Sequence, residues 1–363
     1  MNKPILTFFL SCIFFYNAFA QKLNRIDLGL IPPRQTNCTN VKDQFISSTC
    51  WSFSSNSFLE SELMKMGRGN FDLSEMFIAR YSMLRKIRRH LQLKGQNFFT
   101  PGGQFHDVMW VIKNYGIVPE STYPGKGRGE NSHNHSEMDT VLSRYVKDMV
   151  SKGVVNMNAE QEHFIDSVLD HYLGPVPKEF SYKARTYTPK TFLEQVLKFN
   201  PDDYIEITSY THHPFYGSFV LEDKYNWTGD AYYNVTITDF SRITDSALKN
   251  GYTVGWDGDA QDAYFDFTEG LAYMPDAIND FQAARQKAFE DQTTLLDHMM
   301  HIVGVVKDIK GQKWYYIKNS WGDYSNSLGG FLFMRDDYFK IRTVAIIVNK
   351  KAIPADINKK LYQ

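Results

Sequence analysis

The hydrophobic and polar positions divide the chain into a helical first part and a β-rich last part. From Trp51 to about Tyr115, apolar residues recur at helical spacing in SNSFLESELMKM and LSEMFIARYSMLRKI, and the runs end at glycine or proline. The last third contains HIVGVVKDI, KWYYIKNSW, GGFLFMR and TVAIIVNKK, short runs rich in β-branched and aromatic residues between Gly, Asp and Asn turns. The pattern predicts an α+β fold.

Residues 125–200 are polar and charged and contain two stretches with helical periodicity, DTVLSRYVKDMVSKG and AEQEHFIDSVLDHYL. Their loop carries His133 and His135, for which we expect a solvated turn, because no cysteine or carboxylate frame of metal-ligand spacing accompanies them. The preceding helical run is basic on one side, which we expect to be a solvated helix face rather than a nucleic-acid patch. The basic residues of that run are Arg80, Arg85, Lys86, Arg88 and Arg89.

The first twenty residues have the order of a secretory signal peptide. Lys3 is followed by the apolar run ILTFFLSCIFF and by Ala18-Phe19-Ala20, so cleavage is expected before Gln21. The apolar run is short for a membrane span, which needs about 20 residues. A retained anchor, or a lipoprotein modified at Cys12, is the alternative. We expect a secreted or periplasmic protein without stable membrane insertion.

Charge and composition indicate which classes of partner the chain is expected to bind. The 363 residues include 40 basic and 41 acidic residues, a net charge of −1. Such a chain offers no electrostatic basis for binding nucleic acid or an anionic membrane. Aromatic residues make up 15% of the chain, which favours a densely packed globule of one large domain or two lobes.

Two cysteines remain after the predicted cleavage, Cys38 and Cys50. In an exported protein they could form a disulfide, because oxidising compartments favour disulfides. The alternative is that Cys50 is a nucleophile. It lies where the helical pattern of VKDQFISSTCWSFSSNSFLESEL begins, and N–H groups at a helix N-terminus stabilise a thiolate.

A thiol nucleophile also needs a base, a group that orients the base, and an oxyanion donor. LLDHMMHIVGVV offers His298 and His301, which lie on opposite faces if the run is a strand. In YYIKNSWGD, the side-chain oxygen of Asn319 could accept an imidazole N–H. Gln44, six residues before Cys50, could place its amide beside the Cys50 N–H.

The ordered set of Gln44, Cys50-Trp51, Asp297-His298 and Asn319-Ser320-Trp321-Gly322 resembles the papain-like cysteine peptidases. PGGQFHDVMWVIKNYGIVPES, DHMMHIVGVV, KWYYIKNSWGD and GGFLFMRDDYFK…IIVNKKAIPADI are similar, in this order, to the bleomycin hydrolase/aminopeptidase C branch. The spacing from Cys50 to His298 is longer than the roughly 130–150 residues of simple papain-like enzymes. The resemblance implies a two-lobed papain-like fold with a helical insertion at about 125–200.

The resemblance also implies a role for each matching residue. Cys50 would be the nucleophile, His298 the base, Asn319 its orienting partner and Gln44 an oxyanion donor. His298 fits better than His301, because a glycine follows it by six residues. Trp321 would cover the His–Asn bond.

Four more residues are predicted to contact substrate. The resemblance implies that Gly102 and Gly103 let a substrate peptide lie alongside the cleft. Asp297 precedes the base, and Asp257 is a candidate for meeting a basic group or a substrate amine, with a solvated turn as its alternative. Peptides are the expected partners, no metal or cofactor is expected, and a homo-oligomer, a hexamer in the related enzymes, is left open.

The chain departs from the branch in two places. Ser48 stands where a glycine is usual two residues before the nucleophile, and we expect it to affect the oxyanion loop. NKKAIPADINKKLYQ ends at Gln363, short of the arm that restricts the branch to removing N-terminal residues. We therefore expect an exported thiol peptidase, aminopeptidase-like, with endopeptidase or dipeptidyl-type cleavage and a catalytically idle binding protein as alternatives.

Overall fold

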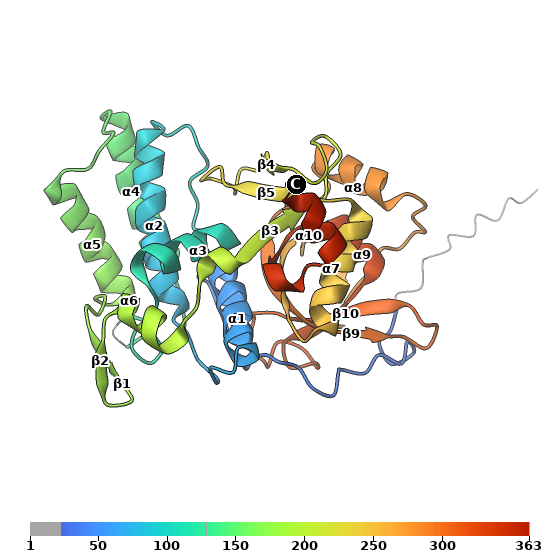
Figure 1. Ribbon diagram of the computed structural model, residues 1–363. Helices are drawn as coiled ribbons and strands as arrows, with labels where there is room; N and C mark the ends of the chain where they lie inside the picture. The colour runs from blue at the N-terminus through green and yellow to red at the C-terminus, as the bar shows by residue number, and fades with distance from the viewer. Residues whose placement is uncertain (1–22, 128, 363) are drawn as a thin grey trace, which may run out of the picture.

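The computed structural model describes residues 23–127 and 129–362, which form two lobes on either side of a long helix. One lobe consists mainly of helices and the other is built around a sheet, as Figure 1 shows. The predicted α+β fold is therefore confirmed. The signal peptide predicted for residues 1–20 lies outside the described residues.

The helical lobe comes from the first half of the chain. Its elements are α1 (Cys50–Lys65), α2 (Glu75–Gln92), α3 (Phe105–Tyr115), α4 (Ser136–Ser151), α5 (Ala159–Leu173), β1 (Phe180–Tyr182), β2 (Arg185–Tyr187), α6 (Pro189–Thr191) and the π-helix η1 (Phe192–Leu197). The stretch 125–200 contributes α4 to η1 and packs into the same hydrophobic cluster as α1 to α3. The β1–β2 hairpin within it was not expected from the sequence. Lys183 and Ala184 make its turn with positive φ angles of 46° and 60°, which is typical of a two-residue hairpin loop.

The second lobe surrounds a ten-stranded sheet among the described residues, with the order β4-β5-β3-β12-β6-β9-β10-β11-β8-β7. Its strands are β3 (Tyr204–Thr208), β4 (Ser218–Val220), β5 (Ala231–Asn234), β6 (Val254–Gly258), β7 (Phe265–Asp266), β8 (Leu271–Ala272), β9 (His298–Lys307), β10 (Lys313–Lys318), β11 (Phe331–Arg335) and β12 (Thr343–Asn349). The helices of this lobe are η2 (Pro201–Asp203), α7 (Ile237–Lys249), α8 (Phe281–Glu290), α9 (Asp336–Arg342), η3 (Lys350–Ala352) and α10 (Ala355–Leu361).

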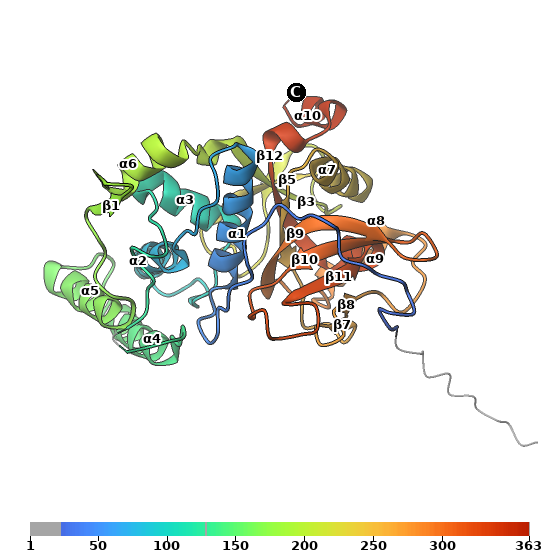
Figure 2. The same cartoon turned by 90° about the horizontal axis from the view of Figure 1, so that it is seen from below.

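Helix α1 lies at the boundary between the lobes, with α2 and α3 on one side and β9 on the other (Figure 2). This position explains its composition, because residues 51–63 are all buried although many are polar. The polar groups find partners on both sides: Ser54 Oγ donates to the Met300 carbonyl of β9 (2.7 Å), and Ser52 Oγ donates to the Glu75 carbonyl of α2 (2.8 Å). The first residue of α1, Cys50, therefore faces the junction of the lobes.

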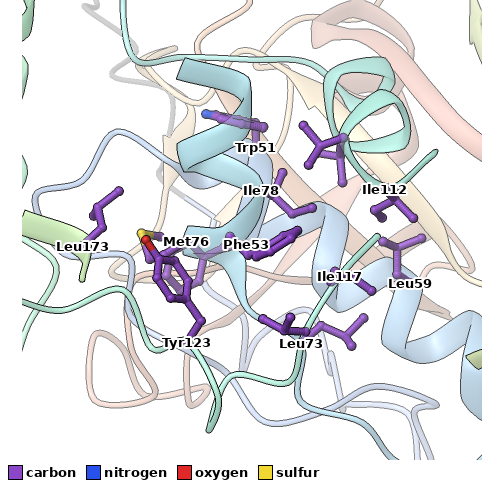
Figure 3. Close-up of a cluster of buried hydrophobic side chains, with 14 of the residues drawn as sticks. Trp51, Phe53, Leu59, Leu73, Met76, Ile78, Ile112, Ile117, Tyr123 and Leu173 are labelled. Atoms are coloured by element: carbon purple, nitrogen blue, oxygen red, sulfur yellow. The ribbon is translucent and has the colours of Figure 1, made fainter. Parts of the chain in front are cut away.

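The core of the helical lobe fixes the orientation of α1. Figure 3 shows Trp51, Phe53 and Leu59 of this helix beside Ile78 of α2 and Ile112 of α3. Each large apolar side chain buried in this way stabilises the fold by roughly 1.5–3 kcal/mol. Among the described helices, none combines the length and the apolar character needed to cross a membrane.

Candidate active site

A cleft of about 370 Å³ opens at the N-terminus of α1, between the two lobes. Its lining contains Cys50 and His298, together with all four residues predicted to contact substrate. The lining residues are Gln44, Ser48, Cys50, Trp51, Thr100, Pro101, Gly102, Gly103, Gln104, Tyr225, Asp257, Leu296, Asp297, His298, Met299 and Trp321. The structure thus brings together residues that are far apart in sequence.

Cys50 is a half-buried free cysteine at the first position of α1, and Cys38 is also free. The disulfide considered between them is therefore absent from the structure. The Thr49 carbonyl accepts the first helical hydrogen bonds, from the N–H groups of Ser52 (2.9 Å) and Phe53 (3.1 Å). The N–H groups before them belong to the unpaired first turn that every helix presents.

His298 begins strand β9, opposite Gly258 of β6. Its Nε2 lies 2.7 Å from Asn319 Oδ1, which also accepts the Ser320 N–H (2.8 Å). An amide oxygen accepts hydrogen bonds, so Nε2 carries the proton and Nδ1 carries the lone pair. The ring of Trp321 covers this pair, with 4.7 Å between its centroid and that of His298.

Gln44 is held by two hydrogen bonds to the residue that follows Asn319. Its N–H donates to the Ser320 carbonyl (2.8 Å), and its Oε1 accepts from the Ser320 hydroxyl (2.7 Å). With Oε1 occupied, the amide presents its Nε2 donor on the other side. Ser320 was not singled out in the sequence, although it lies inside the matched NSW motif.

Burial raises the pKa of the Cys50 thiol to about 12. The N–H groups of Met299 and Trp51 favour the thiolate and oppose this rise, whereas the negative charges of Asp257 and Asp297 add to it. Cys50 alone is therefore a protonated thiol at neutral pH.

Burial also lowers the pKa of His298 to about 4, and the hydrogen bond to Asn319 offsets part of that shift. His298 is consequently neutral and can accept a proton at Nδ1. Ionisation of Cys50 near neutral pH therefore needs a base, and His298, which lines the same cleft, is the candidate.

A family model described as the Peptidase C1-like family matches residues 30–363. The chain belongs to this family. Aminopeptidase C of Lactobacillus delbrueckii subsp. lactis is 24% identical over 392 residues, covering 95% of this chain and 87% of that protein. Aminopeptidase W of the same organism is 27% identical over 393 residues, covering 94% and 87%.

The fold is shared with a solved structure as well. The crystal structure of pepw from Lactobacillus rhamnosis HN001 has a TM-score of 0.73 and 21% identity, over 93% of this chain and 87% of that chain. The resemblance to papain-like cysteine peptidases of the aminopeptidase C branch is thus confirmed, and the α+β fold is papain-like.

Ser48 departs from the glycine usual in this peptidase family, and its backbone shows why glycine suits the position. Its φ is +55°, in the left-handed region, where a side chain costs roughly 1–2 kcal/mol. Phe45 in the same loop has a φ of +47°. The loop between Gln44 and Cys50 therefore contains two strained residues.

We expect Ser48→Gly to raise the free energy of unfolding by about 0.5–1 kcal/mol, because relief of the left-handed strain exceeds the extra chain entropy of glycine. Urea denaturation measures the change. Ser121→Gly is the control, since Ser121 is also exposed but has no positive φ, and it should destabilise slightly. Equal effects of the two substitutions would contradict the strain at Ser48.

The two glycines of the cleft have different requirements. A Cβ on Gly103 would lie 2.8 Å from the indole ring of Trp51, so this position excludes any side chain. A Cβ on Gly102 would make only ordinary contacts, 3.6 Å from Tyr225. Trp51 Nε1 also donates to the Pro101 carbonyl (3.1 Å), which ties this glycine loop to α1.

The solvated basic face predicted for α2 is wrong for Arg80 and Lys86, which are buried. Lys86 reaches under the glycine loop, where its Nζ donates to the carbonyls of Thr100 (2.6 Å) and Gly102. Burial lowers the pKa of Lys86 to about 8, and the negative charges of Asp107 and Asp139 offset part of that shift. A pattern of charges cannot distinguish such a lysine from its exposed neighbours, because its partners are backbone carbonyls.

Lys86→Met should loosen the glycine loop. We expect kcat/KM for peptides to fall about 10- to 100-fold, since small displacements of substrate-positioning groups have effects of this size. The free energy of unfolding should fall by about 2 kcal/mol, because two buried carbonyls lose their donor. Arg88→Met on the exposed side of α2 is the control for both measurements and should change neither. Full activity of Lys86→Met would contradict this role.

The solvated turn predicted for His133 and His135 is also wrong, because both side chains are buried. His133 packs edge-on against Phe53 of α1, with ring centroids 5.7 Å apart. Burial lowers the pKa of each histidine to about 4. They are neutral packing residues.

Asp257 does not lie in a solvated turn either. It is fully buried in strand β6, opposite Met299 of β9, and it lines the cleft. Asp297, next to His298, lines the cleft as well and is half-buried.

Outside the cleft, His212, His213 and Glu222 bring three potential metal ligands within 4.8 Å of one another. Gln286 Nε2 lies 2.9 Å from His212 Nδ1, so this nitrogen accepts and Nε2 carries the proton that faces Glu222 (3.1 Å). Hydrogen bonds thus occupy both nitrogens of His212. We assign no metal to this group.

Proposed function

We propose that the chain is an exported thiol aminopeptidase that cleaves peptide bonds through an acyl-thioester on Cys50. The observation that carries the proposal is the Nε2–Oδ1 contact of 2.7 Å between His298 and Asn319, which leaves the basic Nδ1 of a neutral ring in the cleft that Cys50 lines. Such a set of thiol, base and orienting amide suits acyl transfer.

In the proposed reaction, His298 Nδ1 takes the thiol proton while Cys50 Sγ attacks the scissile carbonyl carbon. The oxyanion that forms accepts hydrogen bonds from the Cys50 N–H and Gln44 Nε2. Collapse of this intermediate breaks the C–N bond, and the imidazolium gives its proton to the leaving amine. Water, deprotonated by His298, then hydrolyses the thioester and restores the thiol.

The names of the relatives support removal of N-terminal residues, since they are called aminopeptidase C and aminopeptidase W. One observation favours a longer substrate as the second candidate. A neighbouring cavity of about 730 Å³ shares Tyr225, Leu296 and Asp297 with the cleft, so room for more residues exists beyond them.

Two measurements test the function. A thiol-directed epoxide inhibitor should modify Cys50, as mass mapping of the adduct would show, and an unlabelled Cys50 in reduced protein would exclude the mechanism. Peptides with free N-termini should be cleaved at their first bond and acetylated ones should resist. Cleavage of both kinds at internal bonds would instead establish the endopeptidase.

Export rests on the order of Lys3, the apolar run and Ala18-Phe19-Ala20. Expression of the full chain in a secreting host, followed by N-terminal sequencing of the recovered protein, tests it. A mature N-terminus at Gln21 is expected. Recovery of uncleaved protein from the cytoplasm would refute export.

A further inference from the structure

Asp257 has an environment that the proposed reaction does not explain. Its side chain is 0% exposed, it lines the cleft, and neither carboxylate oxygen has a hydrogen-bond partner among the described residues. The Gly258 N–H favours the charged form but does not reach hydrogen-bonding geometry. A buried carboxyl group without partners destabilises a fold, so a function that requires it is the simplest reason for its presence.

Other buried or nearly buried carboxylates in the described chain have cationic partners or, like Glu62, Asp259 and Asp308, neutral hydrogen-bond donors. Asp262 pairs with Arg342 (2.7 Å), Glu75 with Lys42 (2.6 Å) and Glu206 with His106 (2.9 Å). No lysine, arginine or histidine within the described ranges forms an ion pair with Asp257 or Asp297. Among the described carboxylates, Asp257 alone is buried with neither oxygen hydrogen-bonded, which leaves room for a partner from outside the fold.

Asp297 adds a second carboxyl group at the same end of the cleft. Its Oδ1 accepts the Ala260 N–H (2.9 Å), but its Oδ2 is buried and without a partner. Burial raises the pKa of Asp257 well above its usual value, and the charges of Glu206, Asp223 and Asp297 raise it further. The empty site therefore favours the protonated form of Asp257, and a cation bound beside it would favour the carboxylate.

The position of the two carboxylates relates them to the nucleophile. The negative charges of both add to the rise in the pKa of the Cys50 thiol that burial causes. Asp297 also directly precedes His298 in the sequence. The aromatic ring of Tyr225 lines the cleft beside them. Burial raises the pKa of Tyr225, and the negative charges of Asp297 and Cys50 raise it further. A substrate group bound there would be close to the scissile bond.

We propose that Asp257 and Asp297 form the ammonium-binding end of the cleft, which holds a cationic nitrogen of the peptide substrate beside Tyr225. The nitrogen is the α-ammonium of a free N-terminus or the side-chain ammonium of a lysine, and the two sources share the same chemistry. Binding supplies the missing counter-charge, which turns two unpaired carboxylates into an ion-paired site. This inference rests on the proposed peptidase function, because it assigns the substrate end of that same cleft.

The test measures binding without cleavage. Two full-length proteins are titrated by calorimetry: the parent Cys50→Ala and the double variant that also carries Asp257→Asn. Four peptides are used, which combine lysine or norleucine as the first residue with a free or an acetylated N-terminus. In the parent, the peptides that carry the recognised ammonium should bind at least about ten-fold tighter, as expected for a charge-assisted contact. Asp257→Asn should remove this difference, and Glu269→Gln, which removes an exposed charge elsewhere, should preserve it.

The pattern of loss identifies the nitrogen. Loss confined to free N-termini assigns the α-ammonium, and loss confined to lysine assigns the side chain. An equal change for all four peptides, or no change, overturns the proposal. Without peptide, the Asp257→Asn protein should have a melting temperature no lower than that of its parent, because it lacks the unpaired carboxyl group. If this variant fails to fold, Asp297→Asn provides the same comparison. Charge-dependent binding without epoxide labelling of Cys50 would refute only the peptidase function.

Discussion

Replacement of Cys50 by alanine should lower kcat/KM for peptides by about 10⁴-fold or more, as loss of the nucleophile does in enzymes that act through covalent intermediates. The expectation follows from the geometry, since the cleft offers one thiol, at the start of α1, beside the Cys50 and Gln44 donors proposed for the oxyanion. The fold should be unaffected, because Cys50 is half-buried and makes no disulfide.

The measurement compares wild type, Cys50→Ala and Cys38→Ala in one continuous peptidase assay, with thermal melting as the check on folding. Cys38→Ala removes the other free thiol of the described chain and should retain full activity. Residual hydrolysis in Cys50→Ala at more than one per cent of wild type would contradict the thioester mechanism. Absence of hydrolysis in the wild type would favour the idle binding protein.

The architecture could be predicted from the sequence where a segment has one buried face or one strong local preference. The β-branched and aromatic runs of the last third became β9, β10, β11 and β12, and the periodic runs after Trp51 became helices. Residues 44, 50, 298 and 319 could be chosen because they match, in residue type and order, the motifs of the papain-like peptidases. The structure places all four around the junction of the lobes.

Helix α1 shows why pattern alone has a limit. It is buried on all sides, and its buried serines and glutamates interrupt any apolar stripe along the helix. The serine hydroxyls instead form hydrogen bonds with carbonyls of α2 and β9. Burial of Lys86, His133 and Asp257 escaped prediction for a related reason. Their surroundings are assembled from segments that are distant in sequence. Composition therefore does not show that Lys86 donates to carbonyls, that His133 packs against an aromatic ring or that Asp257 has no hydrogen-bond partner.

Backbone strain and close packing at single positions also could not be predicted from the sequence. The sequence flags Ser48 as unusual, but only the φ of +55° explains the preference for glycine there. Likewise, the contact that Trp51 would make with a Cβ at Gly103 shows which of the two cleft glycines is required by packing. Both facts concern the shape of the loops that carry the proposed donors and the substrate peptide.

His298→Ala should reduce kcat/KM for peptides by about 10³- to 10⁴-fold, because it removes the acceptor of the thiol proton and the donor to the leaving amine. A second effect separates this role from a structural one. Alkylation of Cys50 by iodoacetamide, an uncharged reagent, should proceed in wild type at pH values below the ordinary pKa of 6.5 for histidine, since burial lowers the pKa of His298 to about 4 and the neutral ring remains available.

In His298→Ala, alkylation should become slow at neutral pH and rise only in alkaline solution, because burial raises the pKa of the isolated Cys50 thiol to about 12. His301 supplies the matched control on the same strand: its Nδ1 is paired with Ser57 Oγ (2.8 Å) and it is absent from the cleft lining. His301→Asn should keep the wild-type alkylation profile. If the two substitutions changed this profile equally, His298 could not be the base, and the thiolate of Cys50 would have to depend on the N–H groups at the start of α1 alone.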